Sequence, residues 1–105
     1  MTEAKRKKLL DLVLNELDIT FNDEKLKNKI GCIMDRGVAY LEDKFGATVD
    51  FIKDKIAMEL LFSYCRYGRS NAIEQFEHDF KSNLTAFALR GAMETAAGQK
   101  EGAKE

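Results

Sequence analysis

The chain has no proline and no tryptophan, and its 105 residues carry a net charge of only −1. Without proline the sequence contains no strong helix breaker, and the abundance of Leu, Ala, Lys and Glu favours helices. No apolar run approaches the roughly 20 residues that a membrane-spanning helix needs. A net charge so near zero gives no overall attraction to nucleic acid or to an anionic membrane.

Residues that commonly carry chemistry are also scarce. The two cysteines, Cys32 and Cys65, each fall within a helical pattern and lack a tight ligand pair such as CxxC, so we expect reduced, partly buried thiols rather than a zinc site. Glu77, His78 and Asp79 are consecutive, so on a helix their side chains point about 100° apart and do not form an acid–base set. No HExxH motif, nucleophile elbow or phosphate-binding glycine loop is present. We therefore expect no enzymatic activity, no cofactor and no metal.

The sequence does contain a sustained helical periodicity. The spacing of its apolar residues predicts an all-α fold, a small bundle of about four helices over residues 1–90, followed by a polar C-terminal tail over residues 91–105. Small, polar and charged residues dominate this tail, which we expect to be flexible unless a partner orders it. The four helices are expected over residues 3–17, 23–45, 50–67 and about 72–89.

Local signals support these boundaries. Asn22 is a suitable N-cap for the second helix, and Gly46 supplies its stop. Gly37 falls on the apolar face of that helix, which predicts close approach of a neighbouring helix. Thr48 or Asp50 is the expected cap of the third helix.

The segment YCRYGRSNAIEQFEHDF (64–80) is predicted to join the third and fourth helices. Gly68 is expected to end the third helix in the left-handed conformation. Asn71 is expected to cap the fourth helix, with Glu74 reaching back to the backbone of the cap.

Aromatic residues are expected to close this joint. Tyr64, Phe76 and Phe80 fall on the inward side of the pattern and pack together. Arg66 and Arg69 point outward, where they pair either with acids of the same chain, such as those of the fourth helix, or with a neighbouring protein.

The apolar stripe that begins at Ile73 continues to Leu89, with Ser82 and Asn83 marking a place where the helix can kink or restart. Gly91 is expected to end the pattern. Met93 is the only large apolar residue of the tail, which makes it a candidate contact for another subunit or a partner.

A run of four cations, Lys5, Arg6, Lys7 and Lys8, precedes the first apolar residues. Such a run is either the solvated start of a helix or a non-specific contact with phosphates or an acidic protein surface.

The apolar bands of three of the four helices are wider than a small monomeric bundle requires, which indicates contact with other subunits. The remaining faces mix both signs of charge, as in DEKLKNK and EDK. Identical subunits packed side by side can pair such faces, and these weak pairs favour one register.

At ELLFSYCRYGRSNAIEQFEHDF (59–80) the chain resembles the head–tail connector family of tailed bacteriophages, small helical adaptors that lie beneath the portal. The resemblance covers about residues 8–90 and rests on packing and capping residues rather than on chemical groups. Its other segments are DEKLKNKIGCIMDRGVAYLEDKFG (23–46), LLFSYCRYGRSNA (60–72) and FEHDFKSNL (76–84).

This resemblance implies a structural virion protein, made in the host cytoplasm and located in the neck of the virion. Its implied partners are a dodecameric ring of its own copies, the portal protein, a downstream neck or tail-completion protein, and DNA that passes through the channel without being read. Arg66, Arg69 and Met93 are the candidate interface residues. The alternative is a small helical, oligomeric phage protein that binds DNA or regulates packaging.

Overall fold

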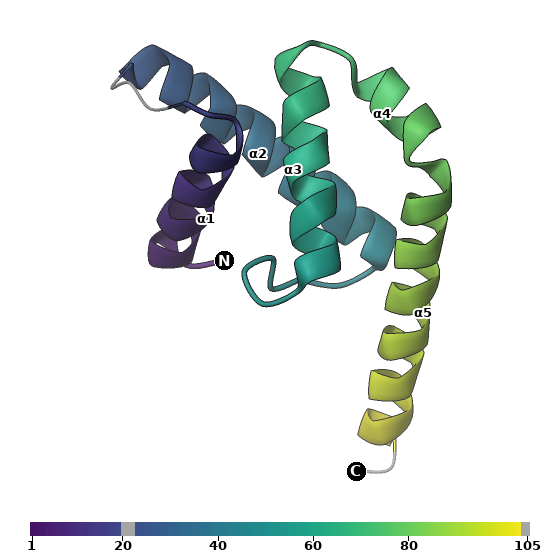
Figure 1. Ribbon diagram of the computed structural model, residues 1–105. Coiled ribbons are helices and arrows are strands. Elements are labelled where there is room, and N and C mark those ends of the chain that lie inside the picture. Colours follow the sequence, from purple (N-terminus) through teal and green to yellow (C-terminus); the bar gives the residue numbers. More distant parts are fainter. Residues whose placement is uncertain (20–22, 104–105) are drawn as a thin grey trace.

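The structure is a computed structural model that describes residues 1–19 and 23–103 (Figure 1). Within these ranges the chain is all-helical and contains no strand, as the sequence predicted. There are five helices rather than about four, because the last apolar stripe is interrupted at Phe80. The helices are α1 (Glu3–Glu16), α2 (Glu24–Phe45), α3 (Lys55–Arg69), α4 (Ile73–Asp79) and α5 (Lys81–Ala103).

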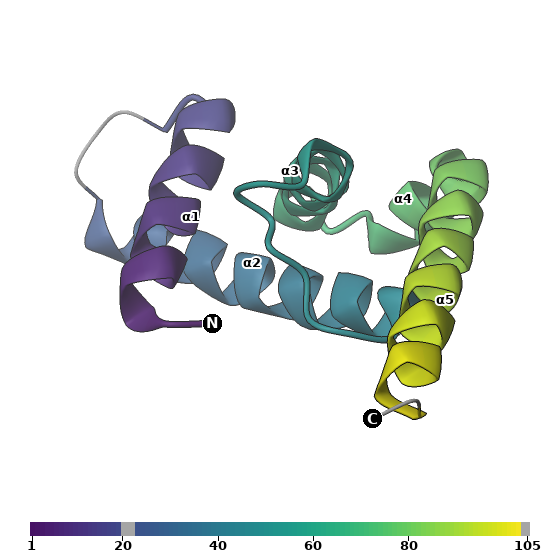
Figure 2. The same cartoon turned by 90° about the horizontal axis from the view of Figure 1, so that it is seen from below.

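Helix α2 is the element on which the others pack. Helix α1 lies against its N-terminal half, α3 crosses it, and α5 packs near its C-terminal end (Figures 1 and 2). The buried side chains come from all five helices, from Ile19 after α1 and from the α2–α3 connection, and form one hydrophobic core around α2. The C-terminal end of α5 extends past the ends of the other helices (Figure 1).

The ends of the first two helices lie close to the predicted positions. Helix α1 is capped by Thr2, whose hydroxyl accepts the N–H of Lys5. The predicted cap Asn22 lies outside the described residues, and Asp23 caps α2 by accepting the N–H of Leu26 at 3.1 Å. Gly46 ends α2 in the left-handed conformation, with φ of 87°, as predicted.

The predicted close approach at Gly37 is confirmed. A Cβ at this position would lie 2.7 Å from Cδ1 of Tyr64 and 2.9 Å from Cδ1 of Leu61. Both side chains belong to α3, so the absence of a side chain at Gly37 lets α3 pack directly on the backbone of α2.

The predicted start of α3 at residue 50 is wrong by five residues. Asp50 does bind backbone N–H groups, those of Ile52 and Lys53, but these bonds close a turn instead of opening the helix. The turn places Phe51 in the core with 2% of its surface exposed. Asp54 is the true cap, since its carboxylate accepts the N–H of Ala57 at 3.1 Å.

The predicted joint between α3 and α4 is correct in place and wrong in detail. Helix α3 continues through Gly68, where a Cβ would lie 2.8 Å from Ile33, so this glycine serves close packing rather than termination. Asn71 is the left-handed residue, with φ of 56°, a conformation that asparagine tolerates. The capping box with Glu74 does not form, because Ala72 holds the cap position and makes no side-chain bond.

The predicted helix end at Gly91 is also wrong. The chain breaks earlier, at Phe80, close to the expected restart at Ser82 and Asn83, and α5 then continues through Gly91 to Ala103. A Cβ at Gly91 would overlap the backbone carbonyl of Phe45, so the glycine allows α5 to touch the end of α2. It stays a prediction that the segment 91–105 is flexible or is ordered by a partner.

The two buried glycines of α2 offer a test of the packing. Replacing Gly37→Ala should lower the free energy of unfolding by about 1–3 kcal/mol, because overpacking outweighs the gain in helix propensity. Gly31→Ala is the matched control: its Cβ would meet only the flexible end of Arg6, at 3.1 Å, and the side chain of Leu10. It should leave stability unchanged or raise it by up to ~1 kcal/mol. Chemical denaturation measures both, and equal effects of the two substitutions would contradict the packing described.

Candidate functional site

An apolar groove of about 570 Å³ lies between α3 and α5. Ile56, on the α3 side, is 59% exposed although it belongs to the apolar band of that helix. Leu60 and Phe87 are buried at the groove's inner wall, and Lys55 and Glu59 stand at its rim. The groove is lined by Lys55, Ile56, Glu59, Leu60, Ser63, Phe80, Asn83, Ala86, Phe87 and Arg90.

A second apolar feature lies on the outer side of α5, which faces away from its buried residues Leu84 and Phe87. Leu89 is 61% and Met93 65% exposed, and their spacing of four residues places them one above the other. Ala86, at the edge of the groove, precedes them by one turn. We refer to Leu89 and Met93 as the α5 stripe. Among the described residues, large apolar side chains with this exposure are otherwise found only at Ile56 and at Met1.

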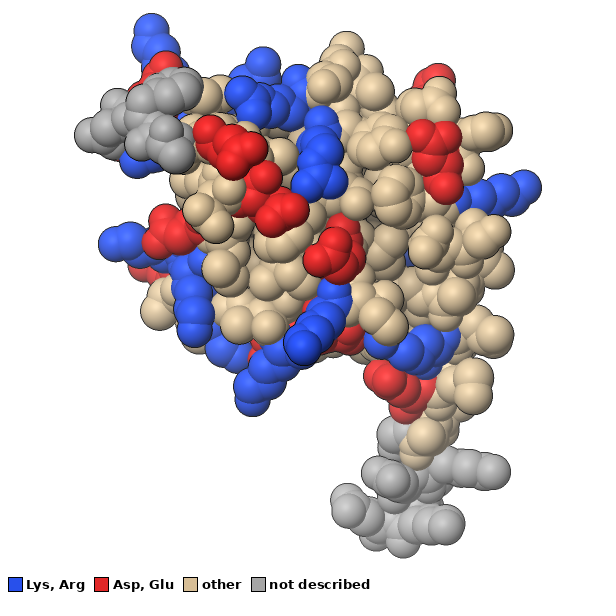
Figure 3. All heavy atoms as spheres, viewed as in Figure 1, with Lys and Arg blue, Asp and Glu red and all other residues tan. Residues whose placement is uncertain are grey.

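The charges are distributed unevenly on the face seen in Figure 3. Lysine, arginine and acidic side chains crowd the α1–α2 side and continue over α3, whereas uncharged atoms predominate over α4 and α5 (Figure 3). An exposed apolar region bordered by polar residues is typical of a protein–protein contact surface.

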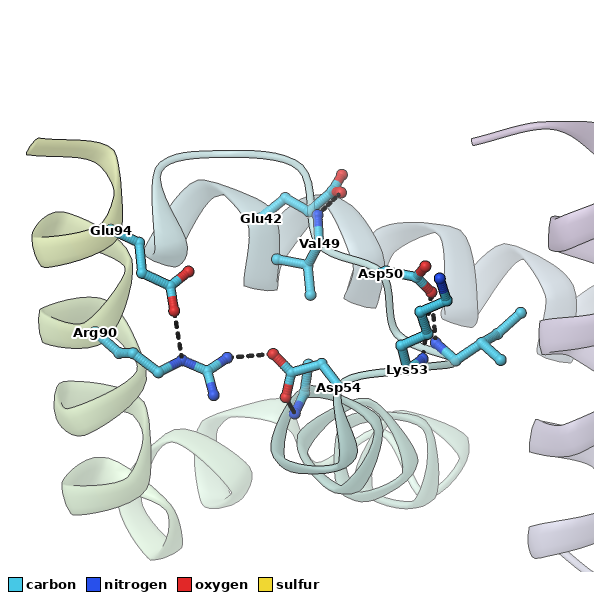
Figure 4. A network of polar contacts seen from close by, with 9 residues as sticks. Glu42, Val49, Asp50, Lys53, Asp54, Arg90 and Glu94 are labelled. Atoms are coloured by element: carbon cyan, nitrogen blue, oxygen red, sulfur yellow. Dashed lines mark hydrogen bonds and ion pairs between the residues drawn. The ribbon is translucent and has the colours of Figure 1, made fainter. Parts of the chain in front are cut away.

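Arg90 fixes the position of α5 at the base of the groove. Its guanidinium pairs with Asp54, the cap of α3 (Figure 4). Its carbon Cζ lies 5.3 Å from the ring centroids of both Phe45 and Phe87. Glu94, one turn along α5, stands 3.9 Å from Nε. The same arginine therefore connects the end of α2, the start of α3 and the middle of α5.

The α2–α3 connection that receives Arg90 is itself held by polar contacts. The N–H of Val49 donates to the carboxylate of Glu42 at 2.9 Å, and Asp50 holds the following turn (Figure 4). With Asp54 both capping α3 and binding Arg90, the middle of α5 is attached to a segment that is held by several hydrogen bonds.

At the C-terminal end of α3 the predicted aromatic joint is confirmed. Phe76 is fully buried, with ring centroids 5.6 Å from Tyr64 and 5.1 Å from Phe80. The prediction missed Tyr40 of α2 and Tyr67, which also pack on Phe76. Tyr40 lies on the apolar face of α2, but the spacing of residues along one helix cannot identify their partners on another.

Two of these tyrosines bind acids of α4. Tyr40 donates its hydroxyl hydrogen to Glu77 at 2.9 Å, and burial followed by this bond raises the pKa of Tyr40 to about 12. Tyr67 donates to Asp79 at 2.8 Å, which raises the pKa of Tyr67 and lowers the pKa of Asp79. His78 is exposed beside Asp79, as expected of a surface histidine.

The candidate interface arginines bind the end of α1 instead of the acids of α4. Arg66 lies 3.1 Å from the carboxylate of Glu16, and Arg69 donates to the carbonyl of Leu17 at 3.3 Å. Neither contributes to the groove. Of the three candidate interface residues, only Met93 belongs to the surface described above.

The basic run does not form one patch. Lys5 lies 3.6 Å from Asp50, and Arg6 forms two bonds to Asp35, at 2.9 and 3.0 Å. Lys7 and Lys8 are exposed. Half of the run is therefore neutralised by acids of the same chain.

The structure offers no site for a metal in the described residues, where no three His, Cys, Asp or Glu side chains converge. Burial raises the pKa of the Cys65 thiol to about 12, whereas Cys32 is exposed. In the part of the chain that is described, no helix is long and apolar enough to span a membrane.

Comparison with known proteins adds no relative: no family model, no curated protein and no solved structure matches this chain. The groove and the α5 stripe are therefore interpreted from their own geometry.

The tyrosines give a pH-dependent test of the joint. Because the folded pKa of Tyr40 is about 12 against an ordinary value of 10.0, its contribution to stability is complete below pH 10 and is lost as pH rises toward 12. Thermal unfolding measured at increasing alkaline pH should show this loss, and Tyr40→Phe should reduce it. Phenolate absorbance should show Tyr40 titrating later in the folded chain than in denaturant. Coincident titration in both states would contradict the buried joint.

Proposed function

We propose that this chain is a non-enzymatic assembly protein of a bacteriophage virion, a head–tail connector whose copies form a ring beneath the portal. The observation that carries the proposal is the exposed apolar surface of α3 and α5, which combines a groove with a projecting stripe. Such a surface serves contact with other proteins.

The dimensions of the molecule support self-assembly. The chain exposes 7225 Å² of surface, roughly 1,300 Å² more than the ~5,950 Å² expected of a compact monomer of 11.9 kDa. Its radius of gyration is 15.0 Å, against about 13 Å for a compact domain of this length. A protein that keeps so much surface outside its own core gains stability by covering part of it with neighbours.

The resemblance to head–tail connectors rests on segments that set the direction of α5. Residues 23–46 contain α2, and residues 60–72 and 76–84 contain the end of α3, the joint and the start of α5. In a connector these elements form a bundle that holds α5 at a fixed angle, so that every copy presents the same surface to the next. The polar tail then belongs to the part that a partner orders.

A dodecameric ring of such copies extends the DNA channel of the portal and offers its far side to the next neck protein. The near-zero net charge suits a channel through which DNA moves without being bound tightly. Lys7 and Lys8 are exposed and available for weak phosphate contact, which is the observation that favours the alternative, a small DNA-binding or packaging regulator.

The decisive experiment is to measure the mass of the purified chain alone and mixed with the portal of its own phage, and to image the mixture by electron microscopy. A connector gives a ring that attaches coaxially to the portal, and gives no discrete complex in a DNA gel shift at physiological salt. A chain that stays single, ignores the portal and shifts DNA would instead be the regulator.

Charge substitutions show whether the proposed surface forms the ring. Met93→Glu should weaken assembly roughly tenfold or more, because a carboxylate in an apolar contact loses its hydration. Ala39→Glu is the matched control, since it adds the same group at an exposed alanine of α2. If the two variants assembled equally well, the α5 stripe would not be part of the contact between copies.

A further inference from the structure

The groove and the α5 stripe have complementary shapes. The groove is concave, about 570 Å³, with Ile56 at its opening and Leu60 and Phe87 at its wall. The stripe is convex, because Leu89 and Met93 stand out from a helix whose end projects beyond the other helices (Figure 1).

The two features cannot cover each other within one chain. Helix α5 itself forms one wall of the groove through Asn83, Ala86 and Phe87. Its stripe lies on the side opposite the buried Leu84 and Phe87, so it faces away from the body. Arg90 opposes a rotation of α5 that would turn the stripe inward, since its guanidinium is bound to Asp54 and lies over the rings of Phe45 and Phe87.

We infer that the groove between α3 and α5 is a binding site for the α5 stripe of a second copy of this chain. This inference rests on the proposed function and names the two surfaces through which neighbouring copies meet. A contact between two different surfaces can be repeated from copy to copy, and it closes into a ring when the rotation permits.

The area agrees with a second copy as occupant. A standard specific interface removes about 800 Å² from each partner. A copy with two neighbours would therefore cover about 1,600 Å² of its surface. The excess surface of this chain over a compact monomer, roughly 1,300 Å², is comparable. A short peptide or a small molecule in the groove would leave Leu89 and Met93 exposed, because they lie outside it.

The charges around the stripe and the groove also agree with a second copy as the occupant. The exposed stripe contains no charged residue, and the neighbouring Arg90 is already paired with Asp54. Inserting the stripe into the groove therefore buries no unpaired charge. Burying an unpaired charge would otherwise weaken the contact strongly. Lys55 and Glu59 remain at the rim of the groove, where water reaches them.

Cross-linking tests the inference. Ile56→Cys and Met93→Cys are made separately in a Cys32→Ser background, with an affinity tag on one of them, and both sites are exposed enough to accept cysteine. Circular dichroism checks that each variant keeps its helices. The full-length variants are mixed and treated with a short thiol-specific cross-linker.

Cross-links between Ile56→Cys and Met93→Cys copies should exceed like-with-like cross-links roughly tenfold, because docking raises the local concentration of one pair only. Ala39→Cys mixed with Ile56→Cys is the control and should remain at the like-with-like level. The double variant Ile56→Cys, Met93→Cys should give a series of multimers rather than only a dimer.

Several outcomes would overturn the inference. If mass measurement finds rings while like-with-like products dominate or the control equals the test pair, the copies meet elsewhere and the proposed function still stands. If only closed dimers form, the contact is two-fold and does not propagate. If the wild-type chain stays single both alone and with portal, the inference and the proposed function fail together.

Discussion

The contact of Arg90 with Asp54 and with the rings of Phe45 and Phe87 is the constraint on which the rest of the molecule depends. It fastens a 23-residue helix by its middle, so that the N-terminal half of α5 completes the core and the other half projects. Gly91 lets the same helix touch the end of α2. Both the groove and the outward direction of the α5 stripe follow from this attachment.

The exposed apolar side chains are too few for one contact between two copies to be strong. Burying Ile56, Leu89 and Met93 stabilises a pair of copies by roughly 1.5–3 kcal/mol for each side chain. The loss of translational and rotational freedom costs about 4–15 kcal/mol, which is comparable with or larger than the total gain of roughly 4.5–9 kcal/mol. A single contact is therefore weak, whereas a closed ring combines many such contacts and gains from the high local concentration of its members. A contact this weak favours assembly on a template, such as the portal of the proposed function, over a stable dimer.

The sequence predicted the features that depend on local spacing. The all-helical fold, the end of α2 at Gly46, the close packing at Gly37 and the aromatic joint around Phe76 all follow from residue type and helical period. The errors arose where one residue type serves two purposes. Gly68 and Gly91 looked like helix ends and instead allow close approach, a difference that only the neighbouring helix decides. Likewise Asp50 and Asp54 are equally good caps by type, and the burial of Phe51 selects the second. The partner of Arg66 on α1, Glu16, is 50 residues away in the sequence, so no local pattern could identify it.

Backbone amide exchange of the projecting half of α5 tests the central claim most directly, because these amides are protected only weakly by the chain's own core. If copies cover one another through this helix, exchange over residues 91–103 should slow as protein concentration rises, while exchange in α1 stays constant. Fast exchange of residues 91–103 at every concentration, both alone and with portal, in a protein whose mass remains that of one chain, would contradict the account.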